Sequence, residues 1–451
     1  MSARWLSATG LSVEGTGIDA WVEHELVGGI FPDLRLKSRL GRWLGDLGER
    51  VGGTLPGDKG RRPVLRQSRI DDGVILSGHI AATTARFTAV PGTVLVLHDT
   101  TEFRFTRNTP DGVGYLSYVK GRHATHATCG RLMHSRLVAT TDGRPLGLAA
   151  VKFWSPKGFK NTNARKRTVN PTTVPIEQKE RVRWLENVTR STQELGDPGR
   201  CVHMGDREAD IFERFHAAHD AETHFLVRTA VDRLADRGGT TVAKVMRRQP
   251  IRGVHQVEVR DDHGHASTAT VPVRFCRLTI HPSPAKRKRY GPLSRTVIHA
   301  AERGRPTGRE PIRWKLLTDL PVDDLVAAVE KLDWYAMRCT IELLFKLWKS
   351  HAPIGTRRTD DPTRQLVVRP AIGRRPDAMG AGDDGVAARP PQSGEGGPGH
   401  PRVRAHSIVW GQAIALAIVL ERFTNRVLKN ARCSFMRNHC SVFVMSCCVK
   451  M

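Results

Sequence analysis

The run TVLVLH at residues 93–98 follows a chain break at Pro91 and Gly92. Its β-branched residues and leucines are typical of a short strand that is buried on both faces. Asp99 comes directly after this run. We therefore expect a central strand with a carboxylate at its end.

Apolar runs further along the chain predict a sheet with helices. The predicted strands first form a meander and then alternate with helices, which describes a mixed α/β sheet covered by helices. An RNase H-like core has this order of elements, and we expect that fold. The predicted strands cover residues 135–140, 147–153, 201–205 and 223–228, and the predicted helices cover residues 176–189 and 209–218.

The segment before the central strand, residues 16–55, is predicted to be helical because its apolar residues recur at intervals of three and four. Basic residues such as Arg35, Arg39 and Arg42 lie between them and could follow a DNA phosphate backbone. An ordinary solvated helix face explains these residues equally well. The apolar residues are Trp21, Leu26, Leu34, Leu40, Leu44 and Leu47.

A chain of 451 residues is long enough for two or three domains. Val-rich alternating stretches at 254–260, 270–280 and 294–300 predict a β-rich insertion into the sheet domain. The expected parts are a helical N-terminal domain (1–90), the first part of the core (91–239), the β-rich insertion (240–313), the second part of the core (314–350), a disordered or frameshifted linker (351–405) and a C-terminal helix and tail (406–451).

The composition is strongly basic, with 71 Lys and Arg against 45 Asp and Glu and a net charge of +26. This charge favours a polyanionic partner, with nucleic acid before a membrane surface, although an arginine-rich solvated surface would also produce it. The start of the chain does not resemble a secretion signal, and the longest apolar stretch, residues 408–420, is too short to span a bilayer. We expect a cytoplasmic protein without a membrane partner.

The C-terminal part of the sequence departs from the pattern of a folded domain. Residues 369–404 are dominated by Gly, Pro, Arg, Ala and Asp, which indicates disorder or a shifted reading frame. Four cysteines and His439 crowd the last residues, but without a CxxC pair they argue only weakly for zinc. These cysteines are Cys433, Cys440, Cys447 and Cys448.

A helix predicted at residues 334–350 combines an apolar stripe with a charged one. At 100° per residue, Tyr335, Arg338, Glu342 and Lys349 share one side, and Lys346 joins them. The other side is apolar and would enter the core. It carries Met337, Ile341, Leu344, Phe345 and Trp348.

A second aspartate, Asp206, follows the predicted strand 201–205, so it resembles Asp99 in its position. A single aspartate after a strand is usually a turn or helix-cap residue. Two adjacent strand ends together with Glu342 would instead gather three carboxylates, which repel one another unless a cation such as Mg²⁺ or Mn²⁺ neutralises them. Two such ions could activate a nucleophile and stabilise the leaving oxygen of a displacement at phosphorus.

These motifs resemble the bacterial insertion-sequence transposases that have a DDE triad and a YREK signature. The matching residues are Asp99-Thr100-Thr101, the run GDREADI at 205–211, and the Tyr335-x2-Arg338-x3-Glu342-x6-Lys349 spacing. The resemblance implies an RNase H-like catalytic domain with a β insertion, in an enzyme that cuts and pastes its own element as a DNA-bound homodimer. It also implies that Asp99, Asp206 and Glu342 are catalytic metal ligands.

The resemblance extends to residues that would bind double-stranded DNA. Tyr335, Arg338 and Lys349, together with Lys346 and Arg207, would hold phosphates near the element end. Trp314 resembles the tryptophan that stacks on a flipped base in relatives that form DNA hairpins. A core aromatic is the alternative, and the position of Trp314 ahead of Tyr335 favours the stacking role. Family members continue after the lysine with helices that pair protomers, and the composition break at 369–404 puts that part in doubt.

Two alternatives remain open from the sequence. A nuclease of the same fold would hydrolyse DNA without joining it, and the tyrosine–arginine–glutamate–lysine spacing argues against this. A non-catalytic protein that occupies element ends and inhibits transposition would arise if the altered C-terminus prevented a productive dimer. The complete triad argues against an inhibitor that was selected as such, but does not exclude a decayed enzyme.

Overall fold

The computed structural model describes residues 18–49, 72–106, 115–120, 125–154, 182–260, 266–306, 309–339, 341–342, 345 and 441–443. Some expectations fall outside these residues. They are the roles of Lys346 and Lys349, the linker at 351–405, and the C-terminal tail with its cysteines, apart from a short strand at 441–443.

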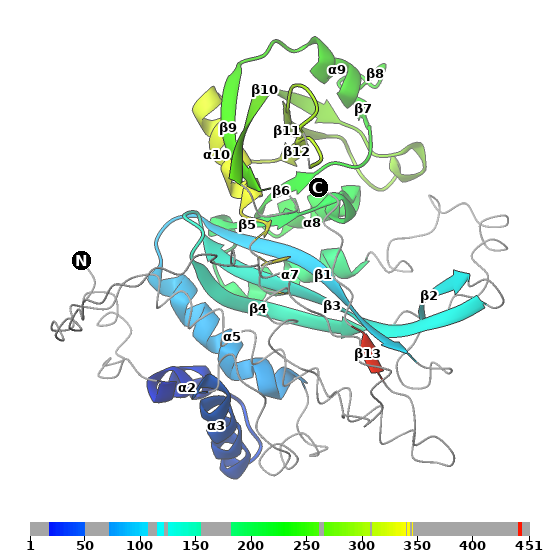
Figure 1. Ribbon diagram of the computed structural model, residues 1–451. Helices are drawn as coiled ribbons and strands as arrows, with labels where there is room; N and C mark the ends of the chain where they lie inside the picture. Colours follow the sequence, from blue (N-terminus) through cyan, green and yellow to red (C-terminus); the bar gives the residue numbers. More distant parts are fainter. Residues whose placement is uncertain are drawn as a thin grey trace, which may run out of the picture.

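Five strands form the centre of one mixed sheet in the order β4–β3–β1–β5–β6 (Figure 1). Strand β3 is antiparallel to both of its neighbours, whereas β1, β5 and β6 run parallel to one another. The expected mixed α/β class is therefore confirmed. The strands are β1 (Val94–Thr106), β3 (Thr125–Thr140), β4 (Pro145–Trp154), β5 (Cys201–Gly205) and β6 (His224–Arg228).

The sheet continues beyond β6 in the order β12–β11–β10–β7–β8, and of these strands β10 and β11 were expected in the insertion (Figure 1). Strand β9 pairs with β10, β2 pairs with β3, and β13 pairs with the far end of β1. The additional strands are β2 (Tyr115–Lys120), β7 (Leu234–Ala235), β8 (Thr240–Thr241), β9 (Gly253–Arg260), β10 (Ala266–Ile280), β11 (Leu293–Ala301), β12 (Arg313–Thr318) and β13 (Ser441–Phe443).

Helices cover both faces of the central strands, because alternate side chains of a strand point to opposite faces. On one face Leu97 packs in the same cluster as Leu332 of α10, and on the other Val96 packs with Phe87 of α5. Trp184 of α7 packs with α8 beneath β6. The helices are α5 (Asp72–Ala89), α7 (Val182–Leu195), α8 (Phe212–Asp220), α9 (Val242–Arg248) and α10 (Leu325–Ala336), with 3₁₀ turns at Pro198–Arg200, Arg207–Ala209 and Pro284–Lys286.

The N-terminal segment is helical, as predicted, and packs on α5 at the lower end of the molecule in Figure 1. It contains α2 (Ile18–Val27) and α3 (Leu34–Glu49). Leu36, Leu40 and Leu44 form the buried stripe of α3. The expectation for Leu34 was wrong, because it is the first residue of α3, off this stripe, and is 77% exposed.

Two boundaries near the predicted site also differ from the expectation. Strand β1 does not end at Asp99 but continues to Thr106, because its antiparallel ladder with β3 extends well beyond its parallel pairing with β5. Helix α10 begins at Leu325 rather than Trp334, where the Asp324 side chain accepts a hydrogen bond from the Ala327 N–H. It ends at Ala336, and a turn at residues 337–338 precedes further helical residues from Cys339.

None of the helices in the described ranges is both long enough and apolar enough to cross a membrane.

Candidate active site

Asp99 lies on β1 just past the point where β1 loses its parallel neighbour. The last parallel pair joins Leu97 to Met204 of β5, and Asp99 itself pairs with Ser135 of β3. Because side chains alternate along a strand, Asp99 points to the same face as Leu97, the face that α10 covers. Its carboxylate accepts a hydrogen bond of 2.9 Å from the Thr100 N–H.

Asp206 directly follows β5, as predicted, and caps the 3₁₀ turn after the strand. Its Oδ1 atom accepts a hydrogen bond of 2.9 Å from the Glu208 N–H. Since β1 and β5 are adjacent and parallel, Asp99 and Asp206 are at the same edge of this strand pair. The charge of Asp206 is one of the causes that raise the pKa of Asp99.

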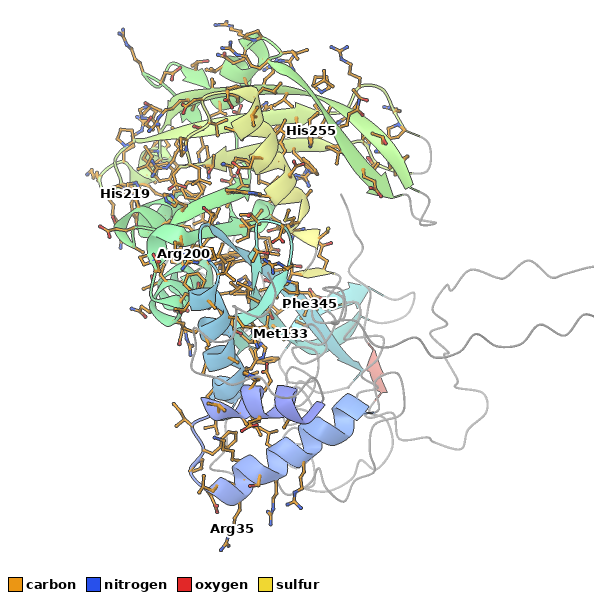
Figure 2. The ribbon with its side chains drawn as sticks, turned by 90° about the vertical axis from the view of Figure 1, so that its left-hand side faces the viewer. Arg35, Met133, Arg200, His219, His255 and Phe345 are labelled. Carbon is orange, nitrogen blue, oxygen red and sulfur yellow. The ribbon has the colours of Figure 1, made fainter. Side chains whose placement is uncertain are left out.

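Glu342 reaches this edge through the segment that follows α10. Ile341 and Phe345 flank it and are buried in the cluster that contains Met133 of β3. Figure 2 shows the labelled Met133 and Phe345 together near the middle of the molecule. Because Met133 pairs with Thr101 of β1, this packing holds Glu342 beside the strand that carries Asp99.

Arg338 joins the carboxylates. Its Nη2 atom donates a hydrogen bond to Glu342, and its Nη1 atom lies 3.6 Å from Asp99 Oδ1. Although burial lowers the pKa of Arg338, the carboxylates of Asp99 and Glu342 raise it to a net value above its ordinary one. Arg338 is therefore a permanent cation between two acids.

One guanidinium does not fully compensate the acids around it. Burial raises the pKa of Asp99 to about 7, helped by the charges of Glu342 and Asp206 and opposed by Arg338. At neutral pH a large fraction of Asp99 is thus protonated. A further cation nearby would favour its ionised form.

The donor set fits a hard divalent ion such as Mg²⁺ or Mn²⁺, because it consists of carboxylate oxygens with excess negative charge. As the side chains stand, however, no three His, Cys, Asp or Glu residues of the described chain are grouped closely enough to hold a metal ion. Arg338 lies between Asp99 and Glu342 at this point. A metal could use these oxygens only after Arg338 has moved.

Tyr335 was expected on the charged side of its helix but is buried in the α10 cluster, only 5% exposed. Its ring stands edge-on to Trp314 of β12, with 5.6 Å between the centroids. Burial raises the pKa of the Tyr335 hydroxyl, and the nearby charge of Arg338 opposes this rise. Trp314 is half-buried against the same cluster, so it has features of both a core residue and a site residue.

The other predicted DNA-binding residue that the structure describes is Arg207. It is exposed in the turn after β5, next to Asp206 in sequence. Its position at the rim leaves it available to a phosphate.

Sequence reasoning missed Arg228, the last residue of β6. Its guanidinium lies near Tyr335 and donates a 3.0 Å hydrogen bond to the Arg313 carbonyl. Burial lowers the pKa of Arg228, and nearby Arg207 and Arg338 lower it further. The available signal was its place at the end of a third parallel strand, the same reasoning that selected Asp206.

A chain of histidines lies behind the carboxylates, on the opposite face of the sheet, and was also missed. His98 Nε2 is 2.9 Å from His203 Nδ1, and His98 Nδ1 is 3.4 Å from His134 Nε2. His134 Nδ1 in turn lies 2.8 Å from the Thr100 hydroxyl. All three histidines are completely buried, and burial holds the pKa values of His98 and His203 well below the ordinary value, so both are neutral.

No protein-family model matches the chain.

Proposed function

We propose that this protein is a DNA transposase of the insertion-sequence type, which cleaves DNA at element ends and joins them to target DNA. The observation that carries the proposal is the position of Asp99, Asp206 and Glu342 at one edge of the sheet, where the charges of Asp206 and Glu342 both act on Asp99 and Arg338 lies between Asp99 and Glu342. These residues come from three separate parts of the sequence. Their convergence does not stabilise the fold by itself, because neighbouring half-buried carboxylates repel one another.

The strand order supports an RNase H-like core. Strands β4, β3 and β1 form an antiparallel meander, and β5 and β6 extend it in parallel on the other side of β1. In this proposal residues 91–239 and 314–350 form the catalytic core, residues 240–313 the β insertion, and residues 1–90 a unit that binds the element end. Strand β12 returns the chain to β6 before α10 leads to Glu342.

The proposed roles follow from the chemistry of each side chain. Asp99, Asp206 and Glu342 hold Mg²⁺ or Mn²⁺, which when bound lowers the pKa of the attacking water or DNA hydroxyl and stabilises the leaving oxygen. Arg338 and Arg228 bind DNA phosphates, since guanidinium groups match phosphate oxygens in charge and geometry. We assign the same task to Tyr335, Arg207, Lys346 and Lys349.

Trp314 is proposed to stack on a base displaced from the duplex end. An indole offers a face for base stacking that does not depend on the base identity. Trp314 is half-buried and braced edge-on by Tyr335, so the two residues would place a stacking surface beside a phosphate-binding hydroxyl. The proposed partners are the terminal inverted repeats, target DNA and a second copy of the chain, in the cytoplasm.

A strand-transfer assay tests the proposal. The protein is incubated with Mg²⁺, a target plasmid and a labelled duplex taken from the DNA that flanks its gene. We expect a joined product that disappears in the Asp206→Asn variant. Release of the end without joining would instead indicate a nuclease, and binding without cleavage an inhibitor of transposition.

Glu342→Gln separates metal binding from DNA binding in the same assay. We expect cleavage to fall at least about a thousandfold, because metal ligands supply several kcal/mol of transition-state stabilisation. DNA binding, measured by gel shift, should change by no more than about twofold, since Glu342 is assigned to the metal and the side chains assigned to DNA phosphates are unchanged. An equal loss of both would refute the assignment of Glu342 to metal.

A further inference from the structure

Arg338 has two distinct halves. Its Nη2 atom is hydrogen-bonded to Glu342, whereas its Nη1 atom is buried near Asp99 and has no hydrogen-bond partner among the described residues. A buried guanidinium N–H without a partner is unfavourable, so this half is suited to donate a hydrogen bond to an incoming anionic oxygen.

Arg338 and a divalent ion compete for the same oxygens. The guanidinium bridges Asp99 and Glu342, and these carboxylates form two thirds of the proposed metal-binding set. An ion bound at the same atoms would stand within a few ångströms of a permanent positive charge, and two cations at that distance repel strongly in a partly buried site.

We propose that Arg338 is an internal counter-ion of the Asp99–Glu342 pair, and that a DNA phosphate draws it away and thereby opens the pair to the divalent ion. This inference rests on the proposed function and adds the order in which DNA and metal bind. Arg338 thus acts as a gate against metal until DNA is present.

The surroundings of Arg338 allow this movement. It lies in the turn between Ala336, where α10 ends, and Cys339, where helical residues resume, and its backbone N–H and carbonyl are hydrogen-bonded to Tyr335 and Ile341. The movement therefore falls to its long side chain, which can turn about its own bonds. Arg228 lies close enough for the charge of Arg338 to lower the pKa of Arg228, and the same charge lowers the pKa of the Tyr335 hydroxyl. A phosphate at this point would therefore meet two guanidinium groups and a phenol. Held by all three, it would be a stronger partner for Arg338 than one carboxylate is.

Coupling of this kind is reciprocal, because two ligands that influence one site change each other's affinity by the same factor. DNA should increase the affinity for Mn²⁺, and removal of the Arg338 charge should reproduce part of that increase without DNA. A DNA phosphate that bound the metal directly would add to the increase in Mn²⁺ affinity caused by DNA. It would not add to the increase caused by removal of the Arg338 charge.

Titration of free Mn²⁺ by electron paramagnetic resonance measures the metal affinity of the full chain directly. Without DNA at pH 7.5, we expect Arg338→Gln to bind Mn²⁺ at least about tenfold more tightly than the wild type, because a nearby cation is removed. Arg338→Lys should be intermediate. Lys315→Gln removes the same charge from an exposed position on β12 and should stay within about twofold of the wild type.

Adding the element-end duplex should tighten Mn²⁺ binding of the wild type by a larger factor than that of Arg338→Gln. The gate would be disproved if folded Arg338→Gln and Arg338→Lys bound Mn²⁺ no more tightly than the wild type, or if the duplex acted equally on all three. If Asp206→Asn and Glu342→Gln left Mn²⁺ binding unchanged, the metal site itself, and with it the proposed function, would be wrong.

Discussion

Titratable residues lie on both faces of the β1–β5 strand pair, and the two faces differ in charge. On the α10 side of the sheet, Asp99 and its neighbours are acids gathered around one cation. On the opposite side, His98 and His203 are buried with the cations Arg136 and Arg214 nearby, and these charges oppose protonation. The thin layer of β1 and β5 therefore separates an acidic cluster from a cluster of neutral imidazoles, which bond one another without adding charge.

The neutral state of His203 makes folding sensitive to acid. Burial, together with Arg214 and Arg136, holds the pKa of His203 in the folded protein well below the 6.5 of an exposed histidine. As the pH falls below about 6.5, the unfolded chain binds a proton there that the folded chain does not, so this contribution to stability is present above that pH and is lost below it. Between the pKa of the unfolded chain and that of the folded protein, the unfolding free energy falls by about 1.4 kcal/mol for each pH unit.

We therefore expect His203→Leu to flatten the pH dependence of stability. Chemical denaturation gives the unfolding free energy at pH 7.5 and at pH 5.5. The decrease between these two pH values should be smaller in the variant than in the wild type by about 1 kcal/mol. The variant would be less stable at pH 7.5, because His98 loses its 2.9 Å partner. His219→Gln, at the exposed position labelled in Figure 2, should leave the pH dependence unchanged; an unaltered slope in His203→Leu would contradict the prediction.

Residue-level prediction succeeded where the placement of a residue depends on local sequence order. Asp206 follows a short apolar strand, and that pattern alone located it correctly. The contacts of Arg338 with Asp99, and of His98 with His203, join residues more than a hundred positions apart in sequence. They depend on which strands become neighbours, and a single sequence does not specify that.

At the level of elements, the crossing of α2 and α5 depends on a glycine at the point of contact. A Cβ atom at Gly78 would lie 2.0 Å from the carbonyl oxygen of Glu25, so the two helices approach at backbone distance. This approach lets His79 reach Glu25 at 2.5 Å while its Nε2 accepts a hydrogen bond from the Leu148 N–H of β4. One buried imidazole thus links the N-terminal helices to the sheet.

Gly78→Ala should separate these helices. We expect a loss of about 2 to 3 kcal/mol in unfolding free energy, since a backbone oxygen cannot move aside as a flexible side chain can. Gly45→Ala in α3 is a matched control, because a Cβ there meets nothing within 4 Å and alanine favours a helix by about 0.5 to 1 kcal/mol. Differential scanning calorimetry of both variants checks this, and equal shifts in the same direction would disprove the close crossing.

Element boundaries were the less predictable part of the fold. The strands β5, β6 and β11 appear close to their predicted residues, because each is a short, largely buried and mostly apolar run. The start of α10 was placed at Trp334, nine residues after its true first residue Leu325, since apolar and charged positions before Trp334 gave no one-sided stripe. Strand β1 was ended too early because a carboxylate inside a strand is rare unless it has a local purpose.

At the scale of the whole molecule, the continuous sheet makes the β-rich insertion part of the core rather than a separate unit. Strand β12 pairs with β6 over only three positions, yet two hydrophobic clusters run across this junction. Val297 of β11 shares a cluster with Phe225 of β6 and Phe215 of α8. The β-rich region between β6 and α10 is thus packed into the same core as the strands that carry the carboxylates.

Such a shared core should unfold as one unit. Val297 is fully buried, and Val297→Ala should lower the unfolding free energy by about 2 kcal/mol through lost packing and a small cavity. Native-state hydrogen exchange followed by mass spectrometry should show the same loss of protection in peptides from β11 and in peptides from β5, more than eighty residues earlier in the chain. Val254→Ala on β9, where the side chain is 51% exposed, should alter neither. If protection fell in β11 alone, the β-rich region would be an independent folding unit, and the position of Glu342 would depend on β12 and α10 without support from the rest of the insertion.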